Sequence, residues 1–175
     1  MEPLPVALDP RKAALREAVI CGSVTLTGLS RFAQALATDE GLVKAQLAFS
    51  RDQENRYIVV VTVSASVVVT CQRCLEPMPL ELSATNHLAV VGDEEQAAQL
   101  PTQLEPLLVP GEECKLWEVV EDELILSLPF ASYHDTEACK ETLRDFNASA
   151  EPAAPEAERP NPFEVLEQLK PGPKE

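Results

Sequence analysis

Two cysteines separated by two residues, Cys71 and Cys74, form the clearest chemical motif in the sequence. Two thiolates at this spacing on a tight turn can both point at one ion, which makes the pair half of a zinc site. A second pair, His134 and Cys139, follows about 60 residues later. Together the four side chains would make a Cys3His set, so the sequence is compatible with zinc as a cofactor held by these residues.

The other interpretation of the same residues is structural. In it Cys71 packs in the core, Cys74 is a free thiol, and His134 and Cys139 lie in a loop. A thioredoxin-like redox motif is disfavoured, because the second cysteine would have to begin a helix and the prolines at 77 and 79 prevent one.

No catalytic constellation stands out in the sequence. It contains no glycine-rich phosphate loop, no H-E-x-x-H motif and no nucleophile elbow. Glu118, Glu121 and Asp122 fall on one face of an expected helix, where we expect solvated carboxylates rather than an acid-base site. The prediction is a protein without enzymatic activity, with no catalytic residues and no evident small-molecule substrate.

The net charge of −15 is concentrated in the second half of the chain. Residues 1–87 contain 8 basic and 9 acidic side chains, and residues 88–175 contain 6 and 20. Binding to RNA phosphates requires a basic surface, because the free energy comes from counterion release. The second half would be repelled by RNA and suits basic protein partners or solubility.

The composition indicates one globular domain in a reducing compartment. Hydrophobic residues make up 45% of the chain but aromatics only 5%, so the core must consist of aliphatic side chains. Residues 1–9 have neither the basic nor the apolar region of a signal peptide, and no apolar run is long enough to cross a bilayer. Five cysteines, an odd number, fit free thiols better than a disulfide framework. We therefore expect a cytoplasmic protein that does not contact a membrane.

Alternating and β-branched segments predict an α+β fold with an antiparallel, barrel-like sheet. Because residues 56–70 would form an unusually long strand, we expect a bulge or bend at Ser64–Ser66, so that one strand serves two sheets or wraps a small barrel. Strands are expected at 19–26, 42–49, 56–70, 80–91 and 105–109, with the last at an edge of the sheet.

Helical patterns are fewer. Ser30 is expected to cap a short helix over 31–37, residues 92–103 to form a short helix or loop, and Leu116–Leu128 to be the main packed helix, ended by Pro129. The predicted domain covers residues 1–146. A disordered linker over 147–160 would then lead to a short amphipathic segment at 161–175. Its stripe of Phe163, Leu166 and Leu169 would dock on a partner or fold back on the core.

Four stretches of the sequence resemble the YceD family, the large ribosomal RNA subunit accumulation proteins. They are the opening Leu8–Lys12, the motif Cys71–Leu75, the run Val120–Pro129 with His134 and Cys139 after it, and the tail from Asn161 to Lys170. The likeness extends over nearly the whole chain. It implies a role in the synthesis, processing or stability of 23S ribosomal RNA, with no known enzymatic activity.

The resemblance leaves two mechanisms open. The protein could hold a basic ribosomal protein or an assembly enzyme through its acidic half and its C-terminal stripe, without contacting RNA itself. Alternatively, its nearly neutral N-terminal half could bind the large-subunit RNA directly. The cationic side chains expected to contact RNA or a partner are Arg11, Lys12, Arg16, Arg31 and Arg73. A zinc-dependent RNA-processing enzyme is the third alternative, and it would need an open metal position and a general base.

Overall fold

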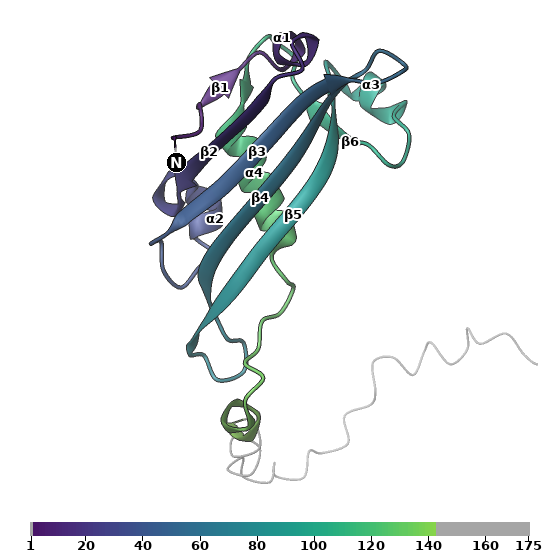
Figure 1. Cartoon of the computed structure of the whole chain (residues 1–175). Helices are drawn as coiled ribbons and strands as arrows, with labels where there is room; N and C mark the ends of the chain where they lie inside the picture. The colour runs from purple at the N-terminus through teal and green to yellow at the C-terminus, as the bar shows by residue number, and fades with distance from the viewer. Residues whose placement is uncertain (1, 143–175) are drawn as a thin grey trace, which may run out of the picture.

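A five-stranded sheet with a long helix across one face organises the chain, as the computed structural model shows (Figure 1). The structure describes residues 2–142. The strands of the sheet lie in the order β2-β3-β4-β5-β6, and a separate two-stranded ribbon pairs β1 with β7. The strands are β1 (Ala7–Leu8), β2 (Val19–Thr25), β3 (Leu42–Arg51), β4 (Tyr57–Thr70), β5 (Pro77–Val91), β6 (Glu105–Leu108) and β7 (Cys114–Lys115). The labelled helices are α1 (Pro10–Leu15), α2 (Ser30–Ala33), α3 (Glu94–Ala98) and α4 (Leu116–Ser127), with a 3-10 turn at Leu26–Gly28. The last described residues, 137–142, are helical as well.

The expected α+β class is confirmed, but the sheet does not close into a barrel. β4 pairs with β5 without a break from Ile58 opposite Ala89 to Thr70 opposite Pro77, so the bulge predicted at Ser64–Ser66 is wrong. The edge strand β6 was expected, yet it runs parallel to β5, because the chain crosses over through α3 before it returns.

Strict alternation along the central strands explains why the sheet has one buried face. The inward side chains of β3 and β4 are small or aliphatic apart from one phenylalanine. They are Val43, Ala45, Leu47, Phe49, Val59, Val61, Val63, Ala65, Val67 and Val69. The alternate positions carry polar side chains such as Lys44, Gln46 and Thr62, and face away from α4. The period of two therefore assigns most residues of these strands to the core or to the opposite face, although Ile58 at the start of β4 is buried out of phase.

The β4–β5 hairpin extends beyond the rest of the sheet. β3 pairs with β4 only as far as Ala65, and β6 pairs with β5 only over Leu88–Val91. From Ser66 to the turn, each strand of the hairpin has only the other as a strand partner among the described residues. This free edge explains how β5 accommodates Pro77 and Pro79, which lack an N–H to donate to a further strand. A two-stranded ribbon is marginally stable by itself, so its tip needs other contacts.

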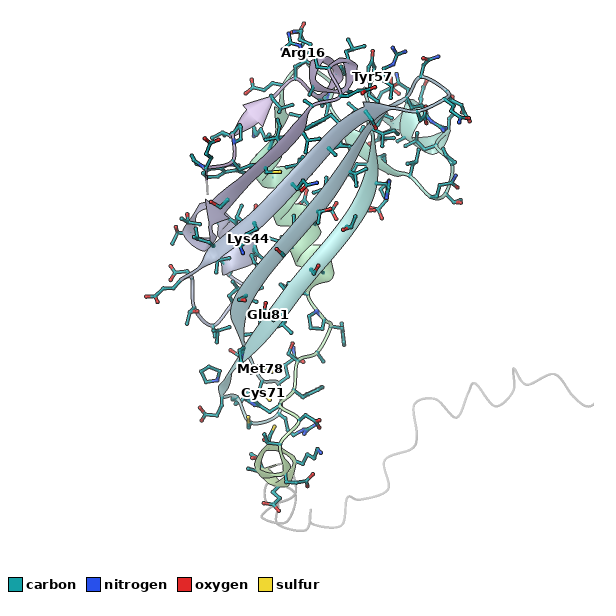
Figure 2. The ribbon with its side chains drawn as sticks, viewed as in Figure 1. Arg16, Lys44, Tyr57, Cys71, Met78 and Glu81 are labelled. Carbon is teal, nitrogen blue, oxygen red and sulfur yellow. The ribbon has the colours of Figure 1, made fainter. Side chains whose placement is uncertain are left out.

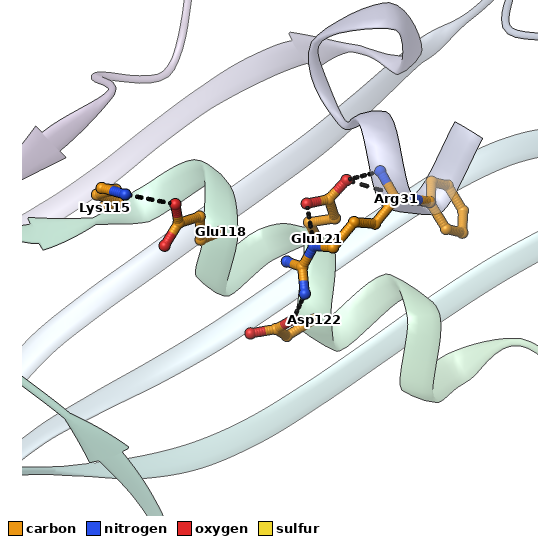
Figure 3. Close-up of polar contacts among 6 residues, drawn as sticks. Arg31, Lys115, Glu118, Glu121 and Asp122 are labelled. Carbon is orange, nitrogen blue, oxygen red and sulfur yellow. Dashed lines mark hydrogen bonds and ion pairs between the residues drawn. The ribbon is translucent and has the colours of Figure 1, made fainter. Parts of the chain in front are cut away.

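One buried carboxylate joins α4 to the start of α2 (Figure 3). Glu121 Oε1 accepts hydrogen bonds from the backbone N–H of Arg31 at 2.7 Å and of Phe32 at 3.1 Å. Its Oε2 pairs with the Arg31 guanidinium at 2.9 Å. The expected solvated face of the helix is therefore wrong at Glu121, which is buried, although Glu118 and Asp122 are exposed.

Glu121 also replaces the cap that the sequence suggested for α2. Ser30 is the first residue of α2 rather than its N-cap, and the helix ends at Ala33 instead of 37. The N-cap position is Leu29, whose side chain cannot accept a hydrogen bond. A carboxylate from a helix about 90 residues further along the chain therefore satisfies these N–H groups.

The smaller elements were only partly expected. Sequence patterns missed α1, which Asp9 caps by accepting from the N–H of Arg11 and Lys12, and the β1–β7 ribbon. The main helix was predicted within one residue of its end, and α3 lies inside the segment expected to form a short helix or loop. Within residues 2–142, no helix is long and apolar enough to cross a membrane. The linker at 147–160 and the docking segment at 161–175 fall outside the described residues, as does the boundary at 146.

Replacing the buried carboxylate tests its structural role. Glu121→Ala is expected to lower the free energy of unfolding by about 1–3 kcal/mol, because it leaves two N–H groups of α2 without an acceptor. Chemical denaturation of the purified protein measures this change. Glu118→Ala is the matched control, since Glu118 makes one exposed ion pair with Lys115 (Figure 3) and should change stability by less than about 0.5 kcal/mol. Equal effects of the two substitutions would contradict the assignment.

Candidate metal centre

The turn between β4 and β5 carries the first cysteine pair in a closed loop. The N–H of Cys71 donates to the carbonyl of Glu76 at 2.9 Å, and the N–H of Leu75 donates to the carbonyl of Cys71 at 3.0 Å. Leu75 has a φ of 62°, which turns the chain back toward β5 directly after Cys74. Both cysteines are thereby presented from one tight loop at the end of the long hairpin.

The second pair reaches the same place in the segment that follows α4. This segment runs alongside the hairpin to its tip, where Cys71 lies (Figures 1 and 2). The N–H of Gln72 donates to the carbonyl of Ser132 at 2.9 Å, and the Arg73 guanidinium lies 4.9 Å from the ring centroid of Tyr133. These contacts hold the segment beside the turn and deliver His134 and Cys139 to it.

All four side chains of the predicted set converge. Their nearest ligand atoms lie within 4.8 Å of one another, with 3.6 Å between Cys71 Sγ and Cys139 Sγ and 3.3 Å between Cys74 Sγ and His134 Nδ1. Two sulfurs bound tetrahedrally to zinc at about 2.3 Å would lie roughly 3.8 Å apart. A disulfide would require about 2.05 Å. The separations and donor types therefore fit a four-coordinate ion better than a cross-link.

The electrostatics of the turn favour a thiolate at Cys71. Burial alone raises the pKa of this thiol, but backbone N–H groups of Cys74, Arg73 and His134 hydrogen-bond to its sulfur and together lower the pKa to about 5. The pKa of the Cys139 thiol is raised, first by burial and then by its neighbours Cys71 and Cys74. Thiolates bind soft cations, and a metal ion would offset the repulsion between adjacent sulfurs.

Within the described residues, a surface hollow borders the cluster. Cys71 and Cys139 are buried and Cys74 and His134 half-buried, and all of them except Cys71 line this hollow of about 290 Å³. An ion could enter from that side and be enclosed from the other.

The two remaining cysteines do not join this cluster. Cys21 is exposed on β2, and Cys114 is buried in β7. Burial, together with the nearby Glu118 carboxylate, raises the pKa of Cys114 to about 11 and leaves it a neutral core thiol.

Most of the cations expected to contact RNA or a partner are engaged within the protein. Arg11 donates to the carbonyls of Gly111 at 2.7 Å and Val109 at 2.9 Å. Lys12 pairs with Asp9 and Glu112, and Arg31 with Glu121 and Asp122. Arg73 lies over the Tyr133 ring, with Nη1 3.9 Å from Cys139 Sγ. Arg16 is exposed at the end of α1. Contacts of these five side chains with RNA or a partner remain predictions.

Sequence reasoning missed the features of the turn that do not depend on residue type. The N–H groups that lower the Cys71 pKa belong to the backbone, and no pattern marks them. The left-handed conformation of Leu75 was also unforeseen, since that region favours glycine. The sequence offered one signal for this conformation: a tight C-x-x-C turn must reverse the direction of the strand.

Substituting Arg11, within α1, and Arg16, at the end of α1, distinguishes an arginine that stabilises the fold from one that lies free on the surface. Arg11→Ala should lower the free energy of unfolding by about 1–3 kcal/mol, because it removes two charge-assisted hydrogen bonds that tie α1 to the loop before β7. Arg16→Ala should change it by less than about 0.5 kcal/mol. Thermal and chemical denaturation provide the measurement. A neutral Arg11→Ala would show that this side chain is available for other contacts.

Two comparisons with known proteins agree with each other. Residues 59–170 match the family model described as large ribosomal RNA subunit accumulation protein YceD. A Haemophilus influenzae protein named large ribosomal RNA subunit accumulation protein YceD is 32% identical over 170 residues, which cover 95% of this chain and 96% of that protein. The comparison with solved structures finds no match. The matched region contains the whole hairpin tip, α4 and all four residues of the Cys3His cluster, and the chain therefore belongs to the YceD family of large ribosomal RNA subunit accumulation proteins.

Proposed function

We propose that this protein is a cytoplasmic accessory factor required for the synthesis, processing or stability of 23S ribosomal RNA. The observation that carries the proposal is its family membership, supported by a relative of that name aligned over 95% of the chain. The family model spans residues 59–170, a range that includes the hairpin tip, α4 and the positions of the Cys3His cluster.

The Cys3His cluster binds a zinc ion in this proposal, as a structural site. Three thiolate sulfurs and one imidazole nitrogen would occupy all four coordination positions of a tetrahedral zinc ion, whereas hydrolytic zinc sites keep the fourth position open for water. This donor set supports an accessory role without catalysis rather than a zinc-dependent RNA-processing enzyme. The ion would fasten the segment after α4 to a hairpin tip that has no third strand in the described part of the chain, so its binding energy would contribute to folding.

In this proposal the protein affects ribosomal RNA mainly by binding other proteins. Arg11, Lys12 and Arg31 are bound to carbonyls or carboxylates of the protein itself, which leaves less cationic surface for phosphates. The acidic second half adds to the repulsion of RNA. Ribosomal and assembly proteins are strong candidates because many of the surfaces they present to RNA are basic.

Metal analysis tests the zinc site directly. Protein purified without chelator should contain about one zinc per chain, and strong chelators should lower its melting temperature while leaving the sheet largely intact. Cys74→Ser should lose most of the metal, and Cys21→Ser is the matched control because Cys21 lies on β2 outside the cluster. Mass spectrometry of the native protein and thermal denaturation measure both effects. Stoichiometric zinc in Cys74→Ser, or a melting temperature insensitive to chelation, would refute the site.

Ribosomal RNA levels test the cellular role. A strain lacking the gene is expected to show a reduced ratio of 23S to 16S ribosomal RNA, restored by the wild-type gene and by Cys21→Ser. Cys74→Ser should restore the ratio less well, because an unfastened hairpin tip destabilises the protein. Quantitative RNA analysis with protein levels from immunoblots provides the readout. An unchanged ratio in the deletion strain would contradict the proposed function.

A further inference from the structure

Leu75 combines two unfavourable features at the hairpin tip. Its φ of 62° places it in the left-handed region, which is unfavourable for a residue with a Cβ. Its side chain is 75% exposed, so core packing does not offset that cost. Among the described residues, the other non-glycine positions with positive φ are Glu17 and Asn55, both polar. Glycine or asparagine would fit this turn better.

Two exposed aromatic side chains lie on the segment that runs from α4 to this tip. Phe130 is fully exposed and Tyr133 is 47% exposed, and both belong to the segment bonded to the tip through Ser132. Single exposed apolar residues are common on protein surfaces and need no explanation. Here Leu75, Phe130 and Tyr133, the knuckle surface, come from two segments that the Cys3His cluster holds together.

Carboxylates dominate the surroundings of the knuckle surface. Asp135 is 99% exposed and Glu137 73% exposed at the side chain, and Glu76 is also exposed. Of the nearby cations, Lys140 pairs with Asp135 and Glu137, and Arg73 lies over the Tyr133 ring. This balance favours a positively charged partner and opposes RNA phosphates.

We propose that the knuckle surface binds a lysine- and arginine-rich protein segment, with Leu75 inserted as an anchor into an apolar pocket of that partner. The strained exposed leucine and the exposed aromatics provide the apolar contact, and the surrounding carboxylates select a basic rim. This inference deepens the proposed function by naming the class of partner and rests on that function for the choice of probe. The probe is the RNA-free total protein of large ribosomal subunits.

Site-specific photocross-linking identifies what Leu75 touches. The full-length protein, with Leu75 replaced by p-benzoylphenylalanine, is irradiated with the RNA-free subunit proteins and, separately, with purified 23S ribosomal RNA. The control carries the photoreactive residue at Ser83, an exposed position on the open face of β5. The proposal expects cross-links from position 75, mapped by mass spectrometry to a lysine- and arginine-rich segment. Cross-links to RNA alone, to acidic segments, or no more than at position 83 would overturn it.

Leu75→Asn separates binding from folding. Asparagine tolerates the left-handed conformation, so this variant should keep its zinc and melt at the same or a higher temperature. Its affinity for the cross-linked protein, purified and measured by titration, should fall about tenfold or more, because the buried anchor is lost. Ser83→Ala should bind as wild type. Affinity within twofold of wild type, or a clearly lower melting temperature, would show that Leu75 is not an anchor.

The two proposals fail separately. If a deletion strain has a low 23S to 16S ratio that Leu75→Asn restores fully, the cellular function stands and the anchor is wrong. If the deletion strain has a normal ratio while position 75 still cross-links to a basic segment, the anchor stands and the ribosomal role is wrong.

Discussion

The structure depends on the contact between the tip of the β4–β5 hairpin and the segment that follows α4. β4 has 14 residues and β5 has 15, so the hairpin is about 45 Å long and outgrows the neighbours that could support it. Beyond Ala65 it has no third strand among the described residues, and a lone ribbon gains little from its own hydrogen bonds. The Cys3His cluster, the Gln72–Ser132 hydrogen bond and the Arg73–Tyr133 stacking supply the missing support.

A second long-range contact acts closer to the centre of the sheet. Glu121 loses hydration on burial, and this cost is offset by two backbone N–H donors and the Arg31 guanidinium. The bonds hold α2 against α4, which places Phe32 in the core. Like the Cys3His cluster, this contact joins residues that are far apart in the sequence. α4 takes part in both arrangements, through Glu121 directly and through the segment that follows its last turn.

How far the sequence predicts this structure depends on the range of the interactions. Alternation is local, so β3, β4 and β5 could be located from it, and so could the apolar stripe of α4. The Cys3His set was also predictable, because thiol and imidazole have few partners and their spacing is restrictive. The burial of Glu121 was not predictable, because this carboxylate accepts hydrogen bonds from the start of α2, which lies elsewhere in the chain. The open sheet was missed because strand length alone does not reveal which neighbours stop short.

The placement of charge connects these features to function. The N-terminal half is close to neutral, and the structure uses several of its cations to tie its own segments together: Arg11 to the loop before β7, and Arg31 to α4. An RNA-binding surface would need those cations free, because phosphate contacts draw their free energy from counterion release. Near the hairpin tip, by contrast, the carboxylates Asp135 and Glu137 are exposed and share a single cationic partner, Lys140. This placement of charge is the reason we propose protein partners with basic surfaces rather than direct binding to RNA phosphates.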